Sequence, residues 1–143
     1  MEDPEDLIEV ELARVVIQEK GDQQILLLRQ RNGERSFSIV IGFNEAAEIN
    51  RKVLGYQSMR PLTHDLLGRV LQKVDWRLAR VVVNDLREHT FYANLVLAPG
   101  GAPTKDEVGQ DREVDCRPSD AICLAVQTHA PIFVKRKVLD QVG

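Results

Sequence analysis

The alternation of hydrophobic and polar residues predicts three β-strands in the first third of the chain. Apolar residues recur through residues 7–18 and 23–29, and the turn-forming pair Gly21-Asp22 lies between the two runs. A second break at Asn32-Gly33 precedes a third run, Ser36 to Ile41. Short runs joined by tight turns are typical of antiparallel strands, so we predict a three-stranded meander.

Three later segments carry apolar residues at helical spacing. The first follows Asn44, a residue type suited to capping, and stops at Gly55. The other two run from Thr63 to Lys73 and from Ser119 to Thr128. Residues 137–143 can add a short helical turn. The pattern therefore predicts about three helices.

The remaining runs predict more strands. Trp76 to Leu86 and His89 to Leu97 form a long hairpin with its connection at residues 85–88, and Pro131 to Val134 returns to strand. The Pro-, Gly- and charge-rich segment 99–112 is typical of an exposed, mobile loop. Because strands and helices do not alternate strictly, we predict an α+β (mixed α/β) domain with an antiparallel-rich sheet.

Length and composition indicate one globular domain over residues 1–143, with an acidic leader at residues 1–6. The chain is 43% hydrophobic and 29% charged, which is ordinary for a folded domain. Its two cysteines have no CxxC spacing, and no apolar stretch approaches the roughly 20 residues of a membrane span. We therefore expect a reduced, cytoplasmic protein without membrane contact.

A formal net charge of −3 gives no general attraction to nucleic acid. Binding to DNA or RNA would require local basic patches. Three groups of cations are candidates for such a patch: Arg29, Arg31 and Arg35; Arg77, Arg80 and Arg87; and Lys135, Arg136 and Lys137. Groups of this kind are most often solvated faces or protection of strand edges.

Two segments of similar sequence stand directly before predicted helices: Arg60-Pro61-Leu62-Thr63-His64-Asp65 and Arg117-Pro118-Ser119-Asp120. Each gathers a guanidinium, a helix-starting proline, a hydroxyl suited to capping and a carboxylate near free backbone N–H groups. Such a position suits an anion or a metal-bridged phosphate. The alternative is that both are ordinary helix starts.

The side chains of these segments offer acid–base and metal chemistry. His64 is a candidate proton carrier or metal ligand, and Asp65 a candidate Mg²⁺ ligand. Adjacent helical residues point about 100° apart, which argues against a simple dyad of these two. Asp65, Asp120 and Glu45 would form a metal site if their helix starts converged.

The arginines, Ser119 and the two cysteines can each be explained by a structural role as well as by a chemical one. Arg60 and Arg117 can donate paired N–H groups to phosphate, or they can form ion pairs with the neighbouring aspartates. Ser119 suits capping better than nucleophilic attack. Cys116 and Cys123 have no histidine near in sequence, so we expect buried, inert thiols.

The stretch from Ile39 to Val134 resembles the bifunctional nuclease family, whose members cleave both DNA and RNA. The motifs that carry this resemblance are, in order, Ile41-Gly42 with Glu45-Ala46, Arg60 to Leu66, Thr90-Phe91-Tyr92-Ala93, Arg117 to Ile122, and Ala130 to Val134. One departure is Cys116, at a position where the family usually has serine. It removes a hydroxyl but no charge.

The resemblance implies a single mixed α/β domain that assembles into homo-oligomers, with a dimer favoured, and that acts on DNA and RNA. It implies catalytic roles for His64, Asp65 and Asp120, substrate binding by Arg60, Thr63, Arg117 and Ser119, and a divalent metal, Mg²⁺ or Mn²⁺, held by Glu45, Asp65 and Asp120.

Two further hypotheses stay open beside metal-assisted phosphodiester hydrolysis. One is a non-catalytic binding or assembly module, with a regulatory role included, whose Arg–Asp pairs only fix the helix starts. The other is a protein that binds a small anion or a nucleotide. All three depend on whether the two Arg-Pro segments approach one another in space.

Overall fold

The computed structural model describes residues 6–18, 20–21, 23–101 and 111–142. These residues form seven strands: β1 (Leu7–Val16), β2 (Gln24–Gln30), β3 (Ser36–Ile41), β4 (Trp76–Arg87), β5 (Thr90–Pro99), β6 (Arg112–Cys116) and β7 (Ile132–Lys135). They also form four helices: α1 (Phe43–Leu54), α2 (Thr63–Lys73), α3 (Pro118–Thr128) and α4 (Arg136–Val142).

The seven strands pair into one sheet in the order β3-β2-β1-β7-β4-β5-β6. The pair β4–β7 is parallel, and the other pairs are antiparallel. The chain is thus an α+β domain with an antiparallel-rich mixed sheet, as predicted. The described part of the tail forms α4, in keeping with the predicted helical turn.

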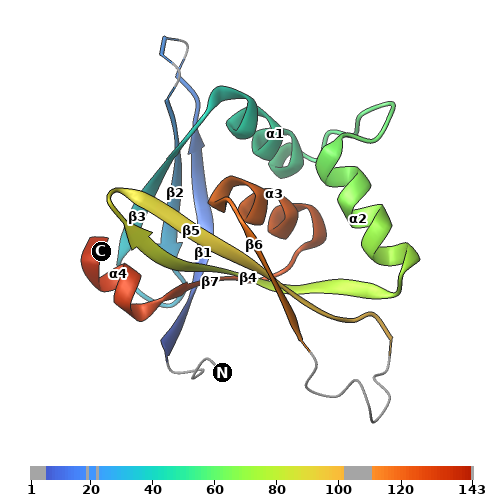
Figure 1. Cartoon of the computed structure of the whole chain (residues 1–143). Coiled ribbons are helices and arrows are strands. Elements are labelled where there is room, and N and C mark those ends of the chain that lie inside the picture. Colours follow the sequence, from blue (N-terminus) through green and yellow to red (C-terminus); the bar gives the residue numbers. More distant parts are fainter. Residues whose placement is uncertain (1–5, 19, 22, 102–110, 143) are drawn as a thin grey trace.

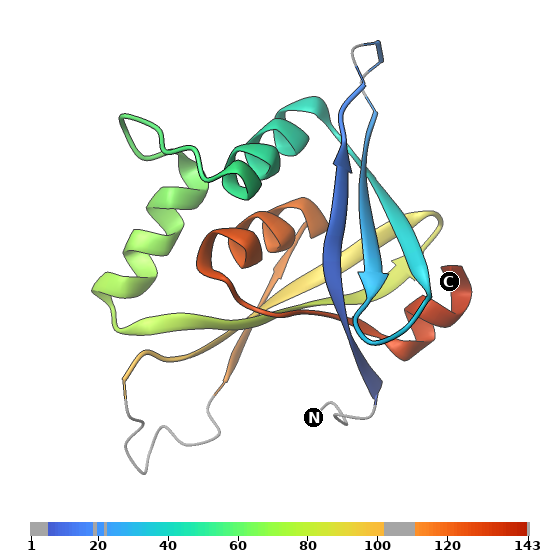
Figure 2. The ribbon, with the colours of Figure 1, turned by 180° about the vertical axis from the view of Figure 1, so that it is seen from behind.

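Three helices cover one side of this twisted sheet, and α3 lies innermost (Figures 1 and 2). The five residues of α3 from Ala121 to Ala125 are each no more than 1% exposed. In contrast, α2 contains no buried residue, and α1 buries Ala46, Glu48 and Ile49. The core therefore lies between α3 and the sheet, and α1 and α2 pack around the outer part of α3.

The predicted hairpin β4–β5 is confirmed, but its turn lies later than predicted. Glu88 and His89 form a two-residue turn with φ angles of 48° and 67°, and Leu86 and Arg87 remain in β4. Positive φ at both central residues is the type I′ geometry that fits the twist of paired strands.

Among the described residues, the predicted loop 99–112 overlaps strands only at its two end residues. Pro99 ends β5, and Arg112 begins β6, which the pattern did not predict. The first four residues of β6 are exposed, so this edge strand has no hydrophobic face to reveal it. Residues 102–110, like residues 1–5 of the predicted leader, lie outside the described residues.

The predicted capping hydroxyls and amide do not cap the helices. The N-cap positions are occupied by Gly42, Leu62 and Arg117. None of these three residues makes a side-chain capping hydrogen bond. Asn44, Thr63 and Ser119 instead lie one or two residues inside the first turn, as the helix bounds show. Proline at the first position of α3 presets the helical φ angle, which displaces the cap to Arg117.

Candidate active site at the start of three helices

The two Arg-Pro segments meet within one chain. His64, in the first turn of α2, places its Nε2 atom 3.0 Å from Oδ1 of Asp120, in the first turn of α3. Both side chains are partly buried, with exposed fractions of 19% and 27%. The duplicated sequence therefore produces one shared polar junction between two helix starts.

Asp120 is also held by the arginine that precedes α3. Arg117 donates from Nε to Oδ2 at 3.0 Å and from Nη2 to Oδ1 at 3.2 Å, and its Nη1 donates to Glu45 of α1 at 3.1 Å. Partial burial acts to raise the pKa of Asp120, but hydrogen bonds from Arg117 and His64 outweigh burial and hold this pKa below its ordinary value. Asp120 is thus an ionised carboxylate that fixes the imidazole.

Asp65 points to a different partner from that of its neighbour His64. Its Oδ1 accepts a hydrogen bond from Lys52 of α1, and its Oδ2 accepts the backbone N–H of Leu62 at 2.9 Å. These two contacts, with Lys52 the stronger, lower the pKa of Asp65. The argument from adjacent helical positions against a His64–Asp65 dyad is consistent with this arrangement.

The first half of α2 is tied to α3 by a side chain of α3. Gln127 donates from Nε2 to the backbone oxygen of His64 at 3.0 Å. A Cβ atom at Gly68 would lie 2.7 Å from the same nitrogen, so the glycine permits this approach. The position of His64 therefore depends on polar contacts at the start of α2.

Glu48 and Lys52, which the sequence did not single out, lie beside this junction, together with Cys123, which was predicted only as a buried, inert thiol. Glu48 of α1, His64 of α2 and Cys123 of α3 bring ligand atoms within 4.8 Å of one another, and Lys52 lies 3.7 Å from Glu48. The sequence signal that could have pointed to these residues was their helical spacing from the predicted site residues. Glu48 and Lys52 follow Glu45 by three and seven residues, and Cys123 follows Asp120 by three, so each lies on the same helix face.

The carboxylates predicted to hold a metal are each engaged by a cation. Glu45 and Asp120 contact Arg117, and Asp65 contacts Lys52. Among the described residues, the group close enough to share an ion is Glu48, His64 and Cys123 rather than these three. Metal binding by Glu45, Asp65 and Asp120 stays a prediction, while a divalent-ion site in this region has a geometric basis.

The predicted substrate-binding residues differ in exposure. Arg60 and Thr63 are exposed, and within the described chain Arg60 has no hydrogen-bond or ion-pair partner. The side chain of Arg117 is 63% exposed despite its contacts. Ser119 is only 6% exposed. Its burial does not favour the predicted contact with substrate.

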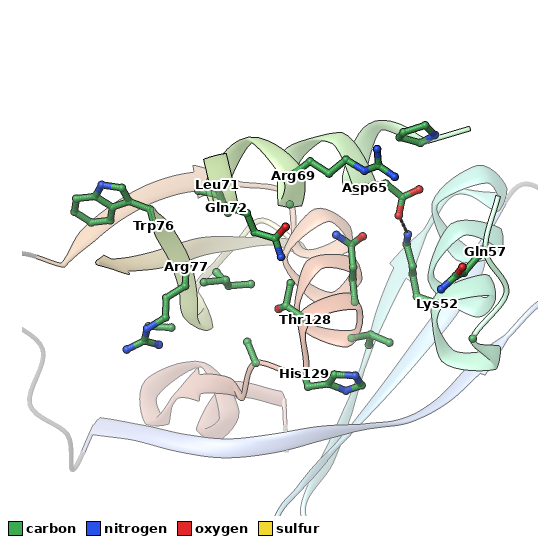
Figure 3. A pocket seen from close by; sticks show the side chains of 18 of the residues that line it. Lys52, Gln57, Asp65, Arg69, Leu71, Gln72, Trp76, Arg77, Thr128 and His129 are labelled. Atoms are coloured by element: carbon green, nitrogen blue, oxygen red, sulfur yellow. Dashed lines mark hydrogen bonds and ion pairs between the residues drawn. The ribbon is translucent and has the colours of Figure 1, made fainter. Parts of the chain in front are cut away.

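A cavity of about 940 Å³ opens beside the junction, between α2, β4 and the end of α3 (Figure 3). Lys52 and Asp65 belong both to this cavity and to the junction. Trp76 and Arg77 lie across the cavity from Lys52. Its charged lining comprises Lys52, Arg69, Arg77 and Asp65, and His129 also lines it. The cavity is therefore locally basic in a chain of negative net charge.

The other basic groups are mostly paired. Arg29 and Arg31 contact Glu11, and Arg35 contacts Asp140. Arg80 contacts Asp111 at 3.7 Å. Arg87 and Lys137 both contact Asp85, at 3.1 and 4.0 Å. Of the arginines in the predicted patches, Arg77 is the one that lines the cavity.

The fold and the junction define a small α+β domain with a polar, partly buried site at converging helix starts. The chain belongs to the family described as "Bifunctional nuclease domain", whose model matches residues 26–143. This confirms the resemblance and extends it beyond residues 39–134. No described helix has the length and apolar character needed to cross a bilayer.

Two proteins from Mycobacterium tuberculosis are similar to this chain over most of its length. "Uncharacterized protein MT1877" of strain CDC 1551 / Oshkosh and "Uncharacterized protein Rv1829" of strain ATCC 25618 / H37Rv are each 36% identical to this chain over 135 residues. The match covers 94% of this chain and 76% of each relative. Family membership is thus shown, and neither relative's name states an activity.

Proposed function

We propose that this protein is a nuclease that hydrolyses phosphodiester bonds of DNA and RNA with the help of a divalent metal. The observation that carries the proposal is the hydrogen-bonded chain Arg117–Asp120–His64, in which a phosphate-binding group, a carboxylate and a proton carrier meet. Membership of a family named for nuclease activity supports it.

Two arginines, Arg117 and Arg60, would bind the phosphate. A guanidinium has five N–H donors, and Arg117 uses three of its donors on Asp120 and Glu45. The other two can bind a phosphate oxygen pair without breaking the junction. Arg60 is exposed and free of ion pairs in the described chain, so it can reach a second phosphate oxygen.

Proton transfer falls to His64. Its Nε2 is hydrogen-bonded to Asp120, which orients the ring and stabilises the imidazolium form that arises when the ring accepts a proton. Asp65 is held ionised beside Lys52, and we assign it to the water or the metal rather than to the imidazole. Glu45, Asp65 and Asp120 are the oxygen donors that would hold Mg²⁺ or Mn²⁺.

The basic cavity supplies a path for the substrate. Lys52, Arg69 and Arg77 present positive charge to a sugar-phosphate backbone. Trp76, whose ring carries the Arg112 guanidinium 4.3 Å from its centroid, adds an aromatic group on which a base can stack. This local charge answers the objection raised by the net charge of −3. The cavity adjoins the junction through Asp65 and Lys52.

Cleavage of labelled single- and double-stranded DNA and RNA tests this proposal, with Mg²⁺ or Mn²⁺ present. His64→Gln should reduce the rate by about 10²–10⁴-fold, the range for loss of a general acid–base. Asp120→Asn should cause a similar loss. The matched controls are His89→Gln, in an exposed turn, and Asp140→Asn, in a surface ion pair with Arg35.

Each variant is purified by the same route as the wild type, so that a contaminating nuclease would show the same rate in all preparations. Full activity in both His64→Gln and Asp120→Asn would contradict the proposed site. Equal loss in the two control variants would assign the effect to folding instead.

A second candidate function is assembly, because the apolar face of α2 is exposed. Leu66, Val70 and Val74 are 56%, 48% and 57% exposed, and they do not line the cavity. We propose that this face joins two copies of the chain in a dimer. Val70→Lys should convert the dimer to a monomer in light scattering after gel filtration, while Lys73→Gln, on the same helix, should not. A monomeric wild type would contradict this.

A further inference from the structure

We propose that Glu48, His64 and Cys123 form a binding site for one divalent transition ion of the zinc class. This site is distinct from the oxygen-rich set assigned above to Mg²⁺ or Mn²⁺. It uses one side chain from each of α1, α2 and α3, the three helices that cover the sheet. The inference does not depend on whether the protein cleaves nucleic acid. With Nε2 on Asp120, an ion on Nδ1 would occupy the second ring nitrogen of His64, so the metal-bound imidazole would be a ligand and not the proton carrier proposed above.

The geometry is that of a compact, largely enclosed ligand set. The ligand atoms lie within 4.8 Å of one another, close enough for a small ion to contact all three after minor side-chain adjustment. Glu48 and Cys123 are 8% and 1% exposed. His64 is the most accessible of the three, so an ion would enter from its side.

Glu48 supplies an oxygen that no hydrogen bond satisfies. Its Oε2 is paired with Arg51, whereas Oε1 is buried without a hydrogen-bond partner in the described chain. The cation beside Oε1, Lys52 with its Nζ at 3.7 Å, directs its hydrogen bond to Asp65 instead. A buried carboxylate oxygen without a hydrogen bond is costly, and a bound cation would reduce that cost.

His64 is already oriented as metal-binding histidines commonly are. Its Nε2 is hydrogen-bonded to the Asp120 carboxylate, which leaves Nδ1 for the ion. A carboxylate behind a ligating imidazole fixes the ring and increases its basicity. Asp120 would therefore support the ligand without touching the ion.

The charge around the cluster also favours a dication. The surrounding set of charges has four carboxylates, those of Glu45, Glu48, Asp65 and Asp120, and three cations, Arg51, Lys52 and Arg117, joined in two separate groups of ion pairs. With neutral His64 the set has one net negative charge. Binding an ion displaces the thiol proton of Cys123 to solvent, which makes the ligand set doubly negative before the dication neutralises it.

The donor types select the class of ion. A thiolate and an imidazole suit Zn²⁺ or Co²⁺, whereas Mg²⁺ prefers oxygen donors and retains its water. Three protein ligands leave one position of a tetrahedral ion for water. Mg²⁺ should therefore fail to displace an ion from this site.

Titration of the reduced, metal-free protein with Co²⁺ tests the proposal without nucleic acid. The wild type should develop a thiolate-to-cobalt charge-transfer band that saturates at one ion per chain. Cys123→Ala should abolish the band, and Glu48→Gln should weaken Co²⁺ binding at least about 10-fold. Cys116→Ala is the matched control, because Cys116 lies outside the cluster, and it should keep the band.

A second readout covers the chance that removing a buried side chain disturbs the fold. Zn²⁺ should raise the Tm of the wild type and of Cys116→Ala, and should leave the Tm of His64→Ala unchanged. His64 is the ligand chosen for this variant because it is the least buried of the three, so its removal disturbs packing least. Excess Mg²⁺ should not reverse the effect of Zn²⁺. Absence of the band in the wild type, or its loss in Cys116→Ala and not in Cys123→Ala, would overturn the proposal.

Discussion

The helix starts at Arg60 and Arg117 share a sequence pattern but differ in their surroundings. Arg117 forms ion pairs with Asp120 and with Glu45, and the helix that follows it is the most buried in the domain. Arg60 is exposed and unpaired in the described chain, and the helix that follows it has no buried residue. The same motif thus begins a core helix in one place and a surface helix in the other.

This difference indicates that the two segments have different structural roles in the site. The Arg117 segment belongs to a helix fixed by hydrophobic burial, so Asp120 has a well-defined position. The Arg60 segment is held mainly by polar contacts of its own, those of His64, Asp65 and the His64 carbonyl. A site of this kind joins a rigid platform to a reactive group whose position depends on a few hydrogen bonds.

The largest contrast should appear in stability after loss of apolar side chains. Ile122→Ala in α3 should lower the free energy of unfolding by about 2–5 kcal/mol, because this side chain is fully buried. Val70→Ala in α2 should change it by less than about 0.5 kcal/mol in the monomer. Urea unfolding at low protein concentration measures both values. Equal costs would contradict the division between the two helices.

Removal of the shared carboxylate should have the next largest effect. Asp120→Asn weakens the contacts of both Arg117 and His64 and should cost about 1–3 kcal/mol. Asp140→Asn breaks only an exposed pair with Arg35 and should cost less than about 1 kcal/mol. Urea unfolding again supplies the measurement. A negligible effect of Asp120→Asn would show that the two helix starts are not coupled.

The dependence of Tm on pH should reveal the same coupling between the two helix starts. The pKa values of Asp65 and Asp120 are lowered in the folded chain from their ordinary 3.8, so the unfolded chain binds protons first as pH falls. Their stabilisation is complete above that value and is lost as pH falls through the lowered pKa values. Tm measured from about pH 6 to about pH 3 should fall less steeply in Asp120→Asn than in the wild type. Parallel curves would contradict this.

The smallest effect on stability should come from Arg60. Arg60→Ala should leave the free energy of unfolding within about 0.5 kcal/mol of the wild type, because the side chain has no partner in the described chain. It should still weaken binding of a labelled oligonucleotide and reduce the salt dependence of binding by about one phosphate contact. An unchanged salt dependence would remove Arg60 from substrate binding.

Local signals in the sequence predicted much of the fold. Turn residues and apolar runs predicted the hairpin β1–β2 and strand β3, and helical spacing predicted the three helices around the site. Strand β6 was missed because an exposed edge strand lacks an apolar face. The predicted connection began too early, at Asp85, because ladder pairing, rather than polarity, extends β4 to Arg87.

The site was less predictable, because its partners come from distant segments. Sequence singled out His64 and Asp120 but could not show that they lie 3.0 Å apart. It offered Arg60 as an ion-pair partner for the neighbouring Asp65, whereas the partner in the described chain is Lys52 of another helix. Cys123 was correctly predicted to be buried, yet its closeness to Glu48 follows only from the packing of α1 against α3.

A double-mutant cycle on the cleavage rate most directly tests the central claim that the two helix starts form one catalytic unit. The rates of the wild type, His64→Gln, Asp120→Asn and the double variant are compared under one set of metal and salt conditions. If Asp120 acts through His64, the second substitution should add less than about 10-fold to the loss caused by the first. Two losses that multiply as independent factors, or no loss in either single variant, would contradict the claim.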